Sequence, residues 1–332
     1  VQAASLLAPG GHLNLVSVAS PGEVLVPSFQ TGSFTSMGTV TLKDGAILDV
    51  SGQLDEFGSP LGNGNSGTVL VRGGQLVMDA STILAITWGA VDGASKAVDI
   101  QVSQKVEITN GSAIKTITFG SGRGGDVQLT ADTLTIENAP ESIVTATPAD
   151  GGGVGGDVVL NVGTVSLTGG SSIRSESQNF TPGLGQGGNV TIQGLEGAGS
   201  VAESVTLSGG SSLVTQTLAS SDGGRVAITA ESLTMDGPGT IINAEATDVG
   251  RVGNLIVSVQ QASLSDGAMI KTIQAFNADP NAQLGPTLTV QGLMGEGSRA
   301  DSVVLSGVGS GIVSNSSGTA RAGDIAVQAK TV

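Results

Sequence analysis

One short phrase recurs along this chain and constrains its fold more than any other feature. Each copy opens with two glycines and a variable residue, then continues into a segment in which apolar and polar residues alternate. Two further alternating segments follow before the next copy. Clear copies start at Gly124-Gly125-Asp126-Val127, Gly155-Gly156-Asp157-Val158 and Gly223-Gly224-Arg225-Val226. A period of two predicts β-strands with one apolar face, and no segment sustains the period of a helix.

The spacing of the copies predicts a stacked solenoid. We expect the first inward residue of each copy at Leu13, Val40, Val69, Val98, Val127, Val158, Val190, Val226, Leu255, Leu288 and Ile325. These positions are about 27 to 37 residues apart, as in solenoid repeats. One copy cannot bury its own apolar face, whereas stacked copies pair their strands in parallel and share a core. The sequence therefore predicts an all-β, single-domain parallel β-helix of about ten three-stranded turns, right-handed by the general crossover preference.

The third segment of each copy carries a second column, which is polar. In each copy a polar residue follows the inward apolar residue by two positions; these residues are Thr116, Thr145, Ser175, Thr215, Asn243, Thr272 and Ser314. For Asn243, the inward apolar residue is taken to be Ile241. Residues two apart share a strand face, so we expect a polar ladder inside the helix or at a corner, with hydroxyls bonded from turn to turn. A ligand-binding row is the alternative, but a solenoid stacks any repeated residue, which favours the structural interpretation.

Composition excludes several classes of function. The 332-residue chain has 28 acidic and 13 basic residues and a net charge of -15. This argues against nucleic acid, which requires a basic footprint, and against anionic lipid surfaces. There is no cysteine, and His12 is the one histidine, so we expect no disulfide, no metal site and no cofactor. No apolar run reaches the length of a membrane-spanning helix.

Both ends of the sequence fall within the repeat pattern. The chain opens at Val1 instead of methionine and stops at Val332 in the middle of a copy. We therefore expect it to be a piece of a longer polypeptide. Strand edges left open at a terminal turn template further strands, so end-to-end or lateral self-association is also expected.

Two longer phrases and the opening of the chain complete the pattern. The phrases are Gln193-Gly194-Leu195-Glu196-Gly197-Ala198-Gly199-Ser200 and Gln291-Gly292-Leu293-Met294-Gly295-Glu296-Gly297-Ser298, and the opening is Leu7-Ala8-Pro9-Gly10-Gly11-His12-Leu13. With the repeat, they make the chain similar to the filamentous haemagglutinin-like exoproteins of two-partner secretion. The resemblance implies a junction from the secretion domain into the first turns over residues 1–37 and a repeat shaft over residues 38–332. It also implies export through an outer-membrane partner transporter and a secreted or cell-surface location. The body of the family's secretion domain is not in this sequence.

The two longer phrases are also inserts in the repeat. The first and second segments are 15 residues apart between Val190 and Val205, and again between Leu288 and Val303, whereas most copies need about 7. Loops stacked on one side of a solenoid often form its contact surface. Candidate partner-binding residues are therefore Leu195, Glu196, Leu293 and Met294. Loop decoration without a partner is the simpler interpretation and stays open.

Aromatic residues suggest one more candidate contact. Trp88 and Phe119 each follow an inward isoleucine, Ile83 and Ile114, by five residues, so they should stack on adjacent turns. A glycan-stacking or partner-binding edge is one interpretation. A small apolar cluster beneath the loops is the interpretation we favour.

Catalysis needs convergent carboxylates, and one column offers them. Asp126, Asp157, Asn189, Arg225, Asn254 and Asp324 stand at the start of the first segment. Asp126 and Asp157 should lie on adjacent turns, as a carbohydrate-active enzyme would require. The same column is a turn position where Asp and Asn bond the local backbone, which we favour. The sequence thus predicts a non-catalytic extracellular structural or adhesive shaft that contacts glycans, host or neighbouring cell surfaces. The alternatives are a polysaccharide lyase or hydrolase and a self-assembling filament or surface-layer subunit.

Overall fold

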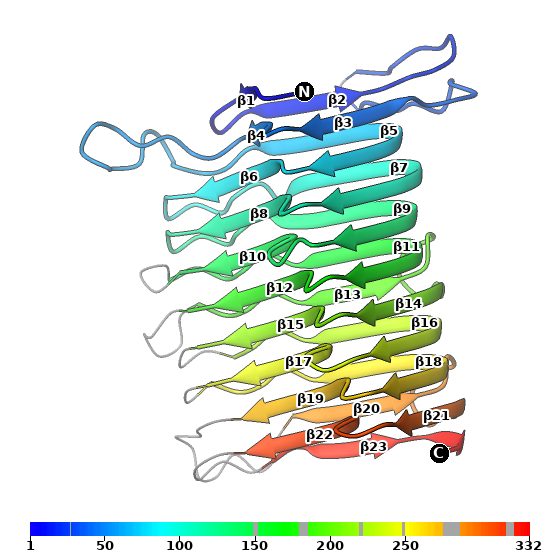
Figure 1. The fold of residues 1–332 in the computed structure, drawn as a ribbon. Helices are drawn as coiled ribbons and strands as arrows, with labels where there is room; N and C mark the ends of the chain where they lie inside the picture. Colours follow the sequence, from blue (N-terminus) through cyan, green and yellow to red (C-terminus); the bar gives the residue numbers. More distant parts are fainter. Residues whose placement is uncertain are drawn as a thin grey trace.

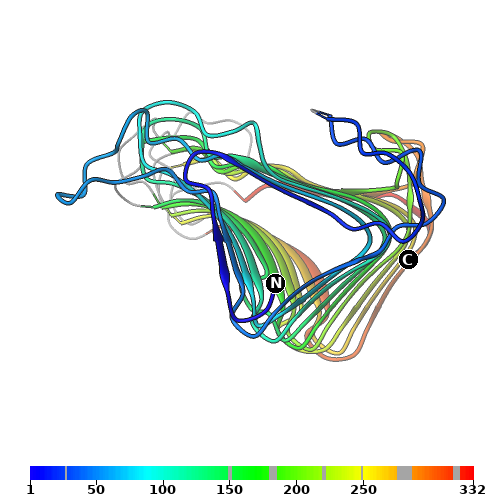
Figure 2. The same ribbon diagram turned by 90° about the horizontal axis from the view of Figure 1, so that it is seen from above.

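The strands stack in parallel into a rod (Figure 1). The computed structural model describes residues 1–26, 28–148, 152–178, 185–218, 222–247, 250–274, 286–316 and 322–332. Within these ranges it contains strands and no helix, hence no helix long and apolar enough to cross a membrane. Seen from above, the rod has a triangular outline, and the chain turns clockwise as it recedes toward its carboxyl end (Figure 2). The predicted right-handed parallel β-helix is confirmed.

The three faces of the rod are numbered in the order in which the chain visits them. Long strands that bend around one corner cover the first and second faces; they are β5 (Thr68–Asp79), β7 (Lys96–Thr109), β9 (Asp126–Glu137), β11 (Val158–Thr168), β16 (Val226–Asp236) and β18 (Leu255–Ser265). Elsewhere separate strands form these faces: β2 (His12–Val16) with β3 (Thr39–Lys43), β13 (Val190–Gln193) with β14 (Ala202–Ser208), β20 (Thr287–Gln291) with β21 (Ala300–Ser306), and β23 (Asp324–Val327) with β24 (Ala329–Thr331).

The third face is built from short strands. They are β1 (Ser5–Leu7), β4 (Ile47–Asp49), β6 (Thr82–Thr87), β8 (Ala113–Thr118), β10 (Ile143–Thr147), β12 (Ser172–Ser177), β15 (Ser212–Thr217), β17 (Ile241–Ala246), β19 (Met269–Gln274) and β22 (Gly311–Ser316). In the described part of the chain, the first-face order from β2 to β23 and the third-face order from β1 to β22 each contain ten strands. The predicted number of turns is therefore correct.

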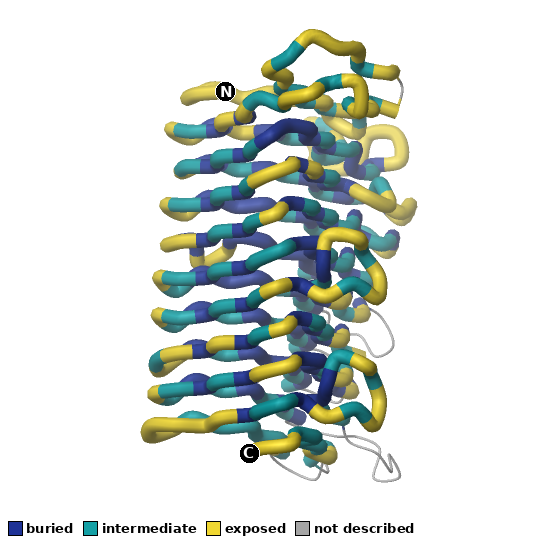
Figure 3. The backbone as a smooth tube through the Cα atoms, turned by 90° about the vertical axis from the view of Figure 1, so that its right-hand side faces the viewer, coloured by how far each residue is buried: buried dark blue, intermediate teal, exposed yellow. Residues whose placement is uncertain are grey.

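A continuous apolar core fills the rod. Val98, Val127 and Val158 pair in register on successive turns and are fully buried. Along β9, the buried inward residues are separated by outward residues that are half-buried or exposed, and a similar alternation is seen along most rungs (Figure 3). Because parallel pairing places like positions above one another, a period-two pattern repeated in every copy builds one core without further specification.

The corners differ in how the chain passes them. The corner between the first and second faces, here called the insert corner, is passed by bent strands or by loops. The corner between the second and third faces, the glycine corner, is a tight turn whose residues adopt positive φ. Among these are Asp44, Gly45, Asn110, Gly111, Asn138, Gly169, Gly170, Gly209, Gly210, Gly237, Gly239, Asp266, Gly267, Gly307 and Gly309. Glycine, Asn and Asp tolerate this left-handed conformation, which explains their recurrence.

Two register predictions are wrong. Val40 does not begin a new copy: β3 pairs with the second half of β5, so Val40 lies beside Leu76 on the second face. Residues 17–26 and 28–38 are therefore a third excursion at the insert corner. Likewise Ile242, not Ile241, pairs with its neighbours on both sides in the inward column. The glycine corner before β17 has one residue more than that before β15, which shifts the register. Asn243 therefore leaves the column, and Ala244 takes its place.

The inward hydroxyl column exists, but its predicted bonding is mostly wrong. Thr116, Thr145 and Thr215 are at most 1% exposed, and their hydroxyls have no hydrogen-bond partner among the described residues. Thr272 and Ser314 do bond to each other across a rung, at 3.0 Å. Rungs are about 4.8 Å apart, longer than the roughly 2.8 Å of a hydroxyl bond, so identical side chains in identical rotamers do not meet.

Candidate functional site

The repeated glycine pair forms a seam at the start of the first face. The second glycine of each pair lies against the backbone of the previous turn. A Cβ atom on Gly188 would come closer than 3.0 Å to the carbonyl oxygen of Gly156, and one on Gly224 would do the same to Gly188. No side chain fits there. The repeat therefore needs this glycine for close backbone approach and not for positive φ.

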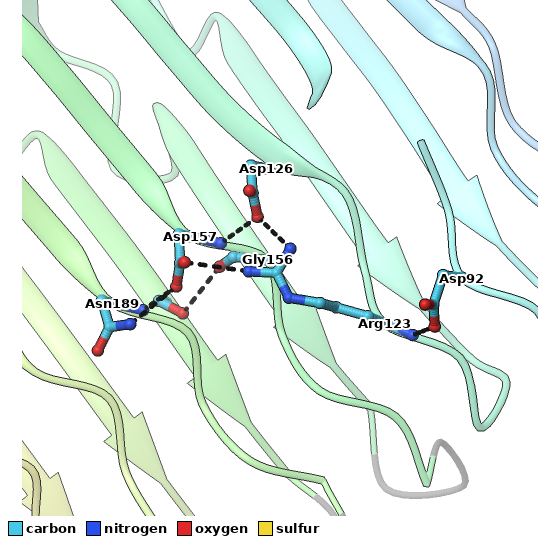
Figure 4. Close-up of polar contacts among 7 residues, drawn as sticks. Asp92, Arg123, Asp126, Gly156, Asp157 and Asn189 are labelled. Carbon is cyan, nitrogen blue, oxygen red and sulfur yellow. Dashed lines mark hydrogen bonds and ion pairs between the residues drawn. The ribbon is translucent and has the colours of Figure 1, made fainter. Parts of the chain in front are cut away.

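Where the residue after the glycine pair is Asp or Asn, as at Asp126, Asp157 and Asn189, its side chain links its turn to the next (Figure 4). The Asp126 carboxylate accepts a hydrogen bond from the backbone N–H of Asp157 at 2.8 Å. Asp157 accepts one from the N–H of Asn189 at 2.7 Å, and Asn189 accepts one from the N–H of Arg225 at 2.9 Å. We call this column, with its glycines, the Gly-Asx seam. The turn-position interpretation of these residues agrees with this geometry.

Arg123 holds the two carboxylates of the seam together. Its guanidinium donates to Asp126 at 2.6 Å and to Asp157 at 3.0 Å, while its backbone N–H donates to Asp92 at 2.7 Å. Burial raises the pKa of Asp126, and the N–H of Asp157 and the Arg123 charge oppose that rise. Both carboxylates therefore already have hydrogen-bond partners: Asp126 accepts from the N–H of Asp157, Asp157 accepts from Asn189, and Arg123 forms ion pairs with both.

Arg123 was not singled out from the sequence, although its position gives a signal. It directly precedes Gly124-Gly125-Asp126, and a basic residue beside a predicted carboxylate column is a natural counter-ion. The sequence does not show that the loop carrying Arg123 places its guanidinium between the carboxylates of two successive turns. His12, by contrast, is exposed at the start of β2. In the described ranges no group of three His, Cys, Asp or Glu residues could hold a metal ion.

The two inserts share one backbone geometry. Gly194 closes its loop by donating to the Ser200 carbonyl at 3.2 Å, and Gly292 donates to the Ser298 carbonyl at the same distance. A Cβ on Gly194 would lie 2.6 Å from the carbonyl oxygen of Val201, so the neck of the loop also requires glycine. Each insert is thus a preformed, tightly closed loop.

The inserts project at the same corner as residues 17–26 and 28–38, where they are seen in green and orange beside the blue of those residues (Figure 2). β13 and β20 are three places apart in the first-face order, or about 14 Å along the rod. Leu195 is 43% and Met294 92% exposed, Glu196 is exposed, and Leu293 is half-buried. The predicted partner residues of the inserts therefore lie on one side of the rod, on two separate loops.

Trp88 and Phe119 lie away from the inserts, just past the third face. Their rings stack on adjacent turns with centroids 4.5 Å apart and planes inclined by 12°, as the spacing predicts. Both side chains are half-buried. One face of each ring is occupied by the other ring, which leaves less aromatic surface for a sugar.

A further groove lies on the third face and was not predicted. This third-face groove has a volume of about 690 Å³ and lies over β12, β15 and β17. Gly170, Gly210 and Gly239 line it from the glycine corner, where they contribute no side chains. Its polar lining consists of Glu141, Ser172, Arg174, Ser212, Gln216, Asn243, Glu245 and Lys271. The sequence hides it because its residues come from turns about 30 to 40 positions apart.

Comparison with known proteins finds no match among family models, curated proteins or solved structures. The resemblance to the filamentous haemagglutinin-like exoproteins therefore stays a prediction.

Proposed function

We propose that this chain is a non-catalytic structural and adhesive β-helix shaft. The observation that carries the proposal is the Gly-Asx seam. It places the most attractive catalytic carboxylates, Asp126 and Asp157, in hydrogen bonds that join one turn to the next. Carboxylates committed to backbone N–H groups stabilise a stack of rungs and are poorly placed to exchange protons with a substrate.

The surface of the rod supports the same role. A net charge of -15 keeps such rods soluble and apart. Against this background, the insert loops offer Leu195 and Met294 to partners, with Glu196 beside them. Exposed apolar side chains on rigid, preformed loops lose little conformational entropy on contact. We infer that the insert corner is the adhesive side of the shaft.

The setting of the shaft follows from the resemblance. We propose export through an outer-membrane partner transporter, then a secreted or cell-surface location, with glycans, host cells or neighbouring cells as contact partners. The bonds of the Gly-Asx seam and the ladders of the three faces supply the stiffness that such an exposed rod needs.

One observation favours an enzyme as the second candidate. The pKa of Asp126 is raised by burial, and an elevated carboxyl pKa beside a second carboxylate is a feature of glycosidase acids. Release of reducing or unsaturated ends from a polysaccharide panel, abolished in Asp126→Asn and Asp157→Asn, would establish this candidate and overturn the non-catalytic proposal.

Adhesion is tested by removing the inserts. Deleting residues 194–201 joins Gln193 directly to Ala202. In the next turn, the positions in register with these two residues are Thr229 and Ala230, which are consecutive within β16, so the shortened chain can pass the corner in the same way. Deleting residues 292–299 follows the pattern of β18. Beads coated with the wild-type chain should adhere to cell or abiotic surfaces, and beads coated with the double deletion should adhere several-fold less. Equal adhesion of the two, with the double deletion correctly folded, would refute the role of the insert corner.

A further inference from the structure

The third-face groove contains outward-facing polar groups that the chain leaves unpaired. Asn243 is 5% exposed; its amide nitrogen donates to Glu245 at 2.8 Å, but its buried oxygen has no partner in the part of the chain that the structure describes. The buried Nε of Arg174 also lacks a partner within the described ranges, although its Nη atoms reach Glu141 and Glu176 at 3.2 and 3.9 Å. Buried polar atoms without partners are rare and energetically unfavourable, so each calls for an explanation.

Other polar groups of the groove are also available. Gln216 makes no side-chain hydrogen bond, and Lys271 makes no ion pair, with any residue of the described ranges. Arg174 and Lys271 lie in one outward column, in register through Val214 and Asn243. They are three rungs apart, about 14 Å. The groove is therefore elongated along the rod, with a cationic side chain at each end and amides between.

This lining selects among ligand classes. Glu141 and Glu245, on a rod of net charge -15, repel nucleic acid and other polyanions. A peptide strand would find no backbone partners, since the groove lies on the outer side of a sheet and not at its edge. An apolar ligand would cover the apolar part of the lining but leave its charged and amide groups without partners. A chain of hydroxyl groups can pair with both the donors and the acceptors of this lining, and its C–H faces match Val214 and Ile241.

We propose that the third-face groove binds a linear oligosaccharide, which lies along the rod over β12, β15, β17 and β19. Sugar hydroxyls bond to Gln216, Asn243 and Glu245 in the centre, while Arg174 and Lys271 bond to hydroxyl or carboxylate oxygens at the ends. This inference does not depend on the insert loops. It adds to the adhesive role a second site on another face and names the chemistry of its ligand.

Calorimetric titration with defined hexaoses tests the proposal. Cellohexaose, chitohexaose, laminarihexaose and a galacturonate hexamer are titrated in turn into the full chain. At least one should bind with a Kd in the micromolar to millimolar range. Asn243→Ala and Gln216→Ala should each weaken that binding about tenfold, the effect of one lost hydrogen bond with its desolvation. Val214→Trp, which fills the groove without removing a polar group, should abolish binding.

The matched controls carry the same kinds of change on another face. Asn161→Ala and Gln193→Ala remove amides that bond to each other at 2.9 Å on the outside of the first face, and they should leave binding unchanged. Circular dichroism and the thermal midpoint confirm that every variant is folded. Absence of binding by all four hexaoses overturns the proposal, as does binding that Val214→Trp leaves intact or that the first-face controls weaken equally. Deletion of the inserts should reduce adhesion without changing hexaose affinity, so the two sites are separable.

Discussion

Substituting Gly188 by alanine tests the structural basis of the repeat most directly. The added Cβ would come closer than 3.0 Å to the Gly156 carbonyl oxygen. That atom belongs to backbone held by the rungs on either side, so it cannot move away alone. The turn that contains β11 and the turn that contains β13 must therefore separate locally instead.

The expected loss of stability follows from the hydrogen bonds that join the two turns beside Gly188. Separation breaks the bond from the Asn189 N–H to Asp157, at 2.7 Å, and weakens the 2.8 Å bond from the Val158 N–H to the Asn189 carbonyl. Each such bond contributes about 1 to 2 kcal/mol net, and overpacking adds about 1 to 3 kcal/mol. Gly188→Ala should therefore lower the free energy of unfolding by roughly 2 to 7 kcal/mol.

Urea unfolding followed by far-ultraviolet circular dichroism measures the effect, and amide hydrogen exchange locates it. A solenoid can open locally, so protection should fall first at Val158 and Asn189. Gly32→Ala is the matched control, because a Cβ at Gly32 meets nothing within 4 Å; it should leave stability unchanged or slightly higher. If both variants unfold within about 0.5 kcal/mol of the wild type, the close-approach explanation of the repeat is wrong.

Three further predictions concern single side chains. Thr145→Val removes a buried, unpaired hydroxyl at nearly constant volume, and should stabilise the rod by about 1 to 2 kcal/mol in urea unfolding; a loss of stability would contradict this. Asp126→Asn keeps the acceptor oxygen for Asp157. Because the pKa of Asp126 is raised in the folded state, wild-type stability falls as pH rises from the ordinary value of 3.8 through the raised one. The stability of the variant relative to the wild type should therefore rise over this pH range and stay higher at neutral pH, which thermal midpoints measured across pH will show. A variant that is more stable than the wild type only in acid would contradict this prediction. Trp88→Ala should cost about 1 to 3 kcal/mol by loss of the stack on Phe119 while leaving bead adhesion unchanged; reduced adhesion of a stable variant would instead make Trp88 a contact residue.

The alternation of the sequence was sufficient to predict the faces of the rod, because parallel stacking repeats one inward pattern on every rung. Register failed where a corner changes length. The extra residue at the glycine corner before β17 moves Ile242 into the column, and nothing in the local alternation of Ile241 and Ile242 distinguishes them. Val40 was misplaced for a similar reason: residues 17–38 carry no phrase that marks them as an insert.

The candidate sites were less predictable than the fold. The stack of Trp88 and Phe119 and the common corner of the inserts follow from counting residues along copies. The bridging role of Arg123 depends on the path of a loop, which alternation does not encode. The third-face groove exists because glycines at corners of separate turns line it and contribute no side chains that would fill it. Such a void is recognisable only after the turns have been placed in register.

The Gly-Asx seam has a direction. In each link, a side chain of the earlier turn accepts from a backbone N–H of the later one: Asp126 from Asp157, Asp157 from Asn189, Asn189 from Arg225. Every residue except proline can supply that N–H, so a finished turn that carries Asp or Asn at this position offers a docking point to whatever sequence follows. A chain that becomes available from its amino end can therefore fold one rung at a time, each rung serving as template for the next, without waiting for the rest of the polypeptide.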